Sequence, residues 1–202
     1  PPTSYDAILA PPHLADAHFS APELFADVHG EVALRGSAAG EGFQSYRIQV
    51  GKGLNPQAWL QIGKEMTEPV EEGLLARWDT SGLSGLYALR LLVLREDDRV
   101  DIITTQVSID NQPPTMRIVY PQDGDLIEYR SNRQLEIQVE ATDNLGIESV
   151  DFYLDFQQIG ALVNAPYAWT WATETGKHRL RIVVRDRAGN SVEESLRFEV
   201  AR

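Results

Sequence analysis

Cysteine is absent from this sequence of 202 residues. The absence excludes disulfide frameworks, thiolate zinc sites and thiol nucleophiles together. It does not place the protein inside a cell, because a domain with a sufficient hydrophobic core is stable without a cross-link. Apolar residues make up 43% of the chain, which is enough for such a core.

Long apolar runs are missing as well. No stretch approaches the roughly 18 residues that a membrane-spanning helix needs, and no signal peptide is visible. The chain starts at Pro1 without an initiator Met, which predicts a fragment of a longer polypeptide. The missing signals therefore say nothing about where the parent protein resides.

Basic residues are few, since 18 Lys and Arg stand against 30 Asp and Glu and the net charge is −12. A phosphate-binding surface needs clustered Lys and Arg, whereas the basic residues here are scattered along predicted strands. We therefore expect no nucleic-acid partner and no membrane contact by this chain.

What the sequence has instead is an internal repeat. A shift of 91 positions aligns residues 78–95 with the segment that begins at Trp169, without a gap. The aligned pairs are Trp78 with Trp169, Gly85 with Gly176, Leu89 with Leu180, Arg90 with Arg181, Leu91 with Ile182 and Val93 with Val184. Self-similarity of this kind indicates two copies of one domain, each of about 90 residues.

Both copies alternate apolar and polar residues with a period of two, and almost no helical periodicity is present. About seven short strands per copy, separated by Gly, Pro and Asn turns, predict two consecutive antiparallel β-sandwiches. We expect a proline-rich linker at residues 1–16, a first sandwich at 17–112 and a second at 113–202. The first copy carries extra residues near 52–70, which predict an added edge strand or a long loop.

Several motifs carry a resemblance to a known family. In the second copy these are ATDNLG at 141–146, VDFYLD at 150–155, APY at 165–167 and DRAGN at 186–190. Residues 113–200 resemble the bacterial Ig-like modules that follow catalytic domains in surface enzymes. The first copy has YRIQVGKGLNP at 46–56, WDT at 78–80 and VSIDN at 107–111, and is similar to the module that precedes such a domain in bifunctional penicillin-binding proteins.

The resemblance implies Ig-like or fibronectin-III-like sandwiches at the C-terminus of a peptidoglycan glycosyltransferase and transpeptidase. The parent's chemistry is not expected in this fragment, because a penicilloyl-serine enzyme needs a Ser-x-x-Lys pair and a Lys-Thr-Gly strand. Lys52, Lys64 and Lys177 are preceded three positions earlier by Gln49, Gln61 and Glu174, and none is followed by Thr-Gly. We therefore assign no catalytic residue and no cofactor-binding residue.

Two groups of side chains are candidates for binding. Asp143, Asp155 and Asp186 stand near predicted turns and could gather around calcium, which prefers oxygen ligands in loops. The alternative is turn chemistry, in which Asp accepts hydrogen bonds from its own backbone. We expect no metal site and no cofactor, with calcium as the alternative.

Aromatic residues are the second group. Trp169 and Trp171 alternate with Tyr167 and are expected in the core, whereas Trp59 lies in the extra segment and, with Tyr153, is a candidate contact for a sugar or a partner.

The expected function is that of a non-catalytic, extracytoplasmic region of a larger, membrane-anchored cell-wall enzyme. It would serve as a spacer or docking module, with the cell-wall glycan or the parent's catalytic domains as partners. The alternative is a carbohydrate-binding or adhesive module of another secreted surface enzyme, such as a glycoside hydrolase or a protease.

Overall fold

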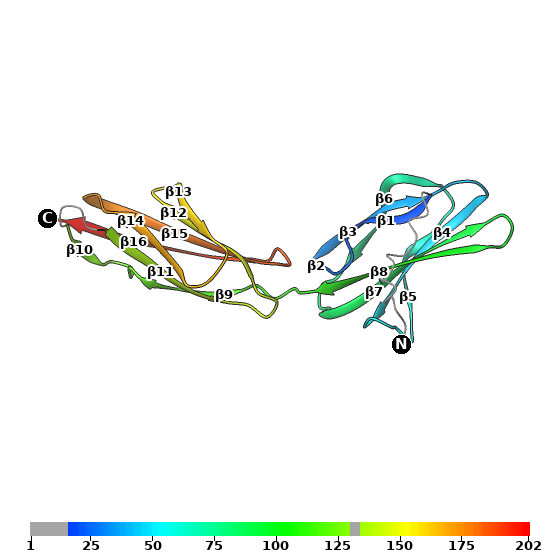
Figure 1. The fold of residues 1–202 in the computed structure, drawn as a ribbon, viewed down its shortest axis with the longest axis horizontal. Helices are drawn as coiled ribbons and strands as arrows, with labels where there is room; N and C mark the ends of the chain where they lie inside the picture. Colours follow the sequence, from blue (N-terminus) through cyan, green and yellow to red (C-terminus); the bar gives the residue numbers. More distant parts are fainter. Residues whose placement is uncertain (1–15, 130–133) are drawn as a thin grey trace, which may run out of the picture. The chain divides into compact units, whose positions relative to one another are not determined.

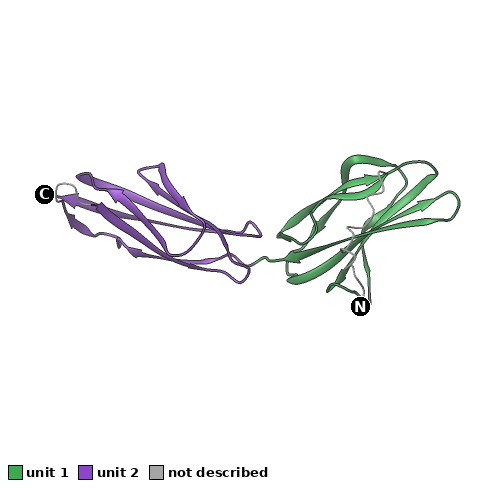
Figure 2. Cartoon of the chain, viewed as in Figure 1, with its two compact units in different colours: residues 1–111 green, residues 112–202 purple. Residues whose placement is uncertain are grey.

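A computed structural model describes residues 16–129 and 134–202, and these residues form strands, turns and loops without any helix. The chain divides into two compact units, residues 1–111 and residues 112–202 (Figure 2). Apart from Asp16, the linker expected at residues 1–16 lies outside the described residues. Within the described ranges no helix is long and apolar enough to cross a membrane.

Unit 1 consists of a three-stranded sheet in the order β1-β3-β6 and a five-stranded sheet in the order β2-β8-β7-β4-β5 (Figure 1). The strand pairs are antiparallel except β2 with β8, which run parallel. The strands are β1 (Ala17–Ala21), β2 (Ala26–Val28), β3 (Glu31–Ala38), β4 (Phe43–Lys52), β5 (Leu60–Met66), β6 (Val70–Asp79), β7 (Gly85–Arg95) and β8 (Val100–Ile109).

Unit 2 repeats the plan with a three-stranded sheet, β14-β11-β9, and a five-stranded sheet, β10-β16-β15-β12-β13 (Figure 1). Strands β10 and β16 form the parallel pair of its larger sheet. The strands are β9 (Thr115–Tyr120), β10 (Leu126–Glu128), β11 (Gln134–Thr142), β12 (Ile147–Leu154), β13 (Gln157–Leu162), β14 (Tyr167–Ala172), β15 (Gly176–Asp186) and β16 (Ser191–Ala201). The prediction of two β-sandwiches is confirmed.

The alternation of the sequence decides which face of each strand is buried. In β11, Leu135, Ile137 and Val139 are buried while the glutamate and glutamine residues between them are exposed. This is the pattern of a sheet with one face on the core and the other in solvent. Each unit thus closes its own core, and every fully buried Leu, Ile or Phe contributes roughly 1.5–3 kcal/mol to its stability.

The repeat corresponds to the C-terminal hairpin of each unit. Strand β7, from Gly85 to Arg95, falls on β15, from Gly176 to Asp186, when it is shifted by 91 positions. The leading tryptophan of each copy stands on the opposite sheet, where Trp78 is buried and Trp169 is half-buried against the core of its unit. The aligned residues are therefore those that build the sandwich.

The extra residues of the first copy add no strand but lengthen the loop before β5 and the strand β6, which has 10 residues against 6 in β14. Both units have the edge strand, β5 in one and β13 in the other, but residues 53–59 connect β4 to β5, whereas residues 155 and 156 alone connect β12 to β13. The long loop folds over the outer face of its sheet, since Gly53 N–H donates to the Leu86 carbonyl at 2.7 Å and the Gln106 amide donates to the Leu54 carbonyl at 3.1 Å.

Candidate functional site

Trp59 stands at the end of the long loop and is half-buried on the outer face of the five-stranded sheet of unit 1. The guanidinium carbon of Arg90 lies 4.1 Å from the centre of its ring. Arg90 is held in turn by Gln49, whose side-chain oxygen accepts its Nε–H at 2.7 Å. The arginine therefore fixes the indole in a cation–π contact.

Tyr153 stands on β12, on the outer face of the five-stranded sheet of unit 2. The guanidinium carbon of its cross-strand neighbour Arg181 lies 4.2 Å from the ring centre, and Arg181 also pairs with Glu193 at 3.2 Å. Arg181 is the residue that the repeat aligns with Arg90. Each predicted aromatic contact residue is thus stacked by an arginine at the same place in its unit.

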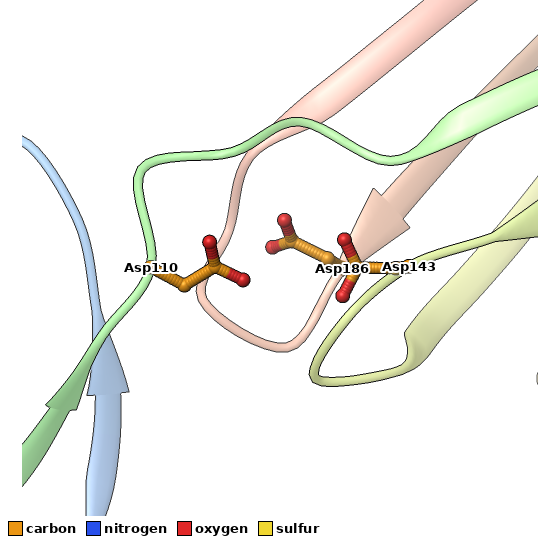
Figure 3. A group of neighbouring side chains, drawn as sticks. All are labelled: Asp110, Asp143 and Asp186. Atoms are coloured by element: carbon orange, nitrogen blue, oxygen red, sulfur yellow. The ribbon is translucent and has the colours of Figure 1, made fainter. Parts of the chain in front are cut away.

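The candidate calcium ligands separate into two places of unit 2. Asp143 and Asp186 lie at one end, with carboxylate oxygens within 4.8 Å of one another (Figure 3). The register explains this, because Ile147 at the start of β12 pairs with Asp186 at the end of β15. Asp155 follows the other end of β12, so it cannot share a site with the other two.

Both neighbouring carboxylates accept hydrogen bonds within their own turns. Asp186 Oδ1 accepts the N–H groups of Gly189 and Asn190, each at 2.8 Å, and its Oδ2 accepts the Asn190 side-chain amide at 2.9 Å. Asp143 Oδ1 accepts the N–H groups of Leu145 and Gly146 at 2.8 and 2.9 Å. Both residues therefore stabilise their own loops, as Asp does in Asx turns.

Asp155 makes a different set of contacts. Its carboxylate accepts the Arg179 N–H at 2.8 Å and lies 2.7 Å from Nδ1 of the buried His178. Desolvation acts to raise the pKa of Asp155, but the hydrogen bonds from Arg179 and His178 and the electrostatic attraction of His178 outweigh it, so the pKa is lower than usual.

His178 is part of the aromatic core at this end of unit 2. Its ring meets Trp171 edge-on at 4.9 Å and lies 5.5 Å from Phe198, while its Nε2 faces the Glu174 carbonyl at 3.1 Å. Both ring nitrogens therefore lie within hydrogen-bond distance of an oxygen. These contacts indicate a structural role for His178.

Sequence reasoning missed one further surface of unit 2. Phe156, Arg179 and Arg197 lie around a hollow on the outer face of its five-stranded sheet. No motif marks these residues, because only the strand register brings Arg179 and Arg197 opposite each other.

Comparison with known proteins places the fold. Residues 114–182 match the family of bacterial Ig domains. Unit 2 is thus similar to a bacterial Ig domain over most of its length. No match was found among curated proteins.

Two of the solved structures with a similar fold cover most of the length of this chain. The fibronectin(III)-like modules of Clostridium thermocellum CbhA are 18% identical, with a TM-score of 0.57 over 91% of this chain and 93% of theirs. The FN1–FN3 domains of chicken CNTN1 are 12% identical, with a TM-score of 0.50 over 93% of this chain and 66% of theirs. At these identities the likeness concerns the fold, which is Ig-like and fibronectin-III-like.

Proposed function

We propose that the two units form a non-catalytic, extracytoplasmic region of a cell-wall enzyme, a penicillin-binding protein, and serve as its spacer or docking module in peptidoglycan synthesis. One observation carries this proposal: each unit closes a complete hydrophobic core. A domain with its own core keeps its form without a partner, as a spacer must. The motifs that resemble the C-terminal modules of penicillin-binding proteins support the choice of parent.

The residues at the boundary between the units support a spacer rather than a flexible tether. Asn111 accepts the Gly30 N–H at 2.8 Å and donates to the carbonyls of Thr80 and Leu83, all within unit 1. The carbonyl of Gln112 accepts the Asn190 amide at 3.4 Å within unit 2. Each of these two adjacent residues is thus bonded to its own unit, and Pro113 and Pro114 further limit backbone freedom.

A pull-down with purified peptidoglycan sacculi tests this function. We expect the full chain to be retained on sacculi, and retention to survive Trp59→Ala. We also expect no covalent labelling by a fluorescent penicillin. A chain that sacculi do not retain contradicts the docking role, and a labelled chain contradicts the non-catalytic assignment.

The contact between Trp59 and Arg90 favours a second candidate, a carbohydrate-binding or adhesive module of another surface enzyme. A partly exposed indole held by a guanidinium group is a suitable platform for a sugar ring. Retention on a polysaccharide that is not part of the wall, lost in Trp59→Ala, would favour this candidate over the first.

A further inference from the structure

The hairpin turn between β12 and β13 presents a large aromatic side chain to solvent. Its two residues, Asp155 and Phe156, have φ angles of 48° and 73°, and Phe156 is 83% exposed. Two-residue turns with both φ angles positive favour Gly at the second position, because a side chain is strained there. Phe156 thus combines a strained backbone conformation with an exposed apolar side chain. Both features are typical of residues that contact a ligand or a partner.

Two arginines beside this turn face each other without acidic partners. Arg179 on β15 and Arg197 on β16 are directly opposed in the register and both exposed. Like charges in this position are destabilising. Across residues 16–129 and 134–202, neither has a carboxylate within ion-pair distance, whereas Arg181 and Arg185 on the same sheet pair with Glu193 and Asp151.

The same residues surround a hollow of about 770 Å³, within the range of about 300–1,000 Å³ that is usual for ligand clefts. Leu126, 72% exposed, lines it together with Phe156. The Arg179 guanidinium lies 5.5 Å from the Phe156 ring centre. The aromatic and the cationic parts of the hollow are therefore adjacent. The hollow therefore combines apolar surface with two arginines.

Two of the carboxylates that line the hollow, those of Asp125 and Asp155, are held by hydrogen bonds. Asp125 accepts the Gln122 N–H at 2.8 Å, Asp155 binds His178 and the Arg179 backbone, and Glu199 stands opposite Lys177. Arg179 and Arg197 lie at the hollow with no ion-pair partner among the described residues, so their guanidinium groups can bind an acidic group of a ligand. Their planar guanidinium groups suit a carboxylate, which they bind with two parallel hydrogen bonds.

The position in the sheet favours a ligand that is bound by side chains alone. Strands β15 and β16 are both interior, so their backbone groups are already paired on either side (Figure 1). An extended peptide cannot join them as an added strand. The surface offers side chains alone, a ring for stacking and arginines for a carboxylate, which is the chemistry of a uronic acid.

We propose that this hollow of unit 2 binds an acidic glycan, with a sugar ring on Phe156 and its carboxylate on Arg179 and Arg197. The site belongs to unit 2 alone. It is independent of which enzyme carries the two units, and it does not involve Trp59.

Affinity electrophoresis of the full chain in gels with polygalacturonate tests the site, with neutral dextran as the reference polymer. We expect retardation by polygalacturonate and none by dextran. Arg179→Gln and Arg197→Gln should each weaken binding about tenfold, the loss of one charge-assisted contact. Arg117→Gln is the matched control, because it removes the same charge from an exposed pair on the other sheet of unit 2 and should leave binding unchanged.

Phe156→Gly separates binding from folding. It should weaken binding several-fold through the loss of stacking, yet leave the melting temperature of unit 2 unchanged or a few degrees higher, because Gly relieves the strained turn. Retardation by dextran, or no retardation by polygalacturonate, overturns the proposal. Equal retardation by polyglutamate that is unaffected by Phe156→Gly also overturns it, since that result describes charge attraction to any acidic polymer.

Discussion

At the scale of single residues, the two units place an aromatic ring against an equivalent arginine in different ways. Arg90 and Arg181 occupy the same position on the outer face of each five-stranded sheet, and each lies over an aromatic ring. In unit 2 the ring is Tyr153, the cross-strand neighbour. In unit 1 that neighbour is Gln49, which has no ring, and the long loop supplies Trp59 instead.

Gly160 gives the clearest prediction for a single residue. It faces the core from β13, where an added Cβ would overlap the indole of Trp169. We expect Gly160→Ala to destabilise unit 2 by about 1–3 kcal/mol through overpacking, measured by urea denaturation. Gln157→Ala, an exposed change on the same strand, is the control and should have little effect; equal stability of both variants would contradict this packing.

The contacts of Asp155 predict a pH dependence. Because its folded-state pKa is lowered, its contribution to stability is fully present above the ordinary pKa and is lost as pH falls through the folded value. We expect Asp155→Asn to be less stable than the parent at about pH 5, and the gap to shrink as the pH falls below the ordinary pKa of Asp, about 4. Thermal melts over this range measure it, and a constant gap would contradict the assignment.

At the scale of elements, loops are stabilised by carboxylates at strand ends. The turn between β15 and β16 depends on Asp186, which is 2% exposed and accepts the N–H groups of Gly189 and Asn190. The same end of the unit holds Asp143 in the loop after β11. These are the residues for which turn chemistry and calcium are the competing hypotheses.

Asp186→Ala separates these hypotheses. We expect a loss of about 1–3 kcal/mol in stability, because two backbone donors lose their acceptor. We also expect the parent chain to melt at the same temperature in excess calcium and in chelator. A melting temperature that rises by several degrees with calcium, and no longer does so in Asp186→Ala, would instead assign these residues to calcium.

The elements that the sequence predicted are those with sustained alternation. Strand β11 is an example, because Leu135, Ile137 and Val139 alternate with polar residues in the sequence and are the buried residues of the strand. Strand β13 was not predicted, because QQIGAL at residues 157–162 has no regular alternation and forms through pairing with the edge of β12. The stacking of Trp59 on Arg90 depends on the path of a loop, which residue types alone do not determine.

At the scale of the whole molecule, the two cores are separate. Each contains apolar residues of both its sheets, and Tyr46 adds a hydrogen bond from β4 to the Leu75 carbonyl on β6, at 2.9 Å. Burial raises the pKa of Tyr46, since the phenolate would lose solvation. The fold follows from core residues that recur along the chain, whereas a partner depends on a few surface side chains that no periodicity reveals.

Separate cores predict independent folding. We expect residues 1–111 and residues 112–202, expressed apart, each to give the dispersed NMR spectrum of a folded β protein. The cut after Asn111 keeps its hydrogen bonds to Thr80 and Leu83 in unit 1. Gly160→Ala should alter the unfolding of the second fragment alone. A collapsed spectrum for either fragment would contradict independent folding.

The parallel pairs, β2 with β8 and β10 with β16, determine when each unit can finish folding during synthesis on the ribosome. Each pair joins an early strand of a unit to its last one. The five-stranded sheet of a nascent unit is therefore incomplete until its final strand leaves the exit tunnel. Such long-range pairing slows folding, so the half-made sandwich is the stage at which this chain most needs protection from aggregation.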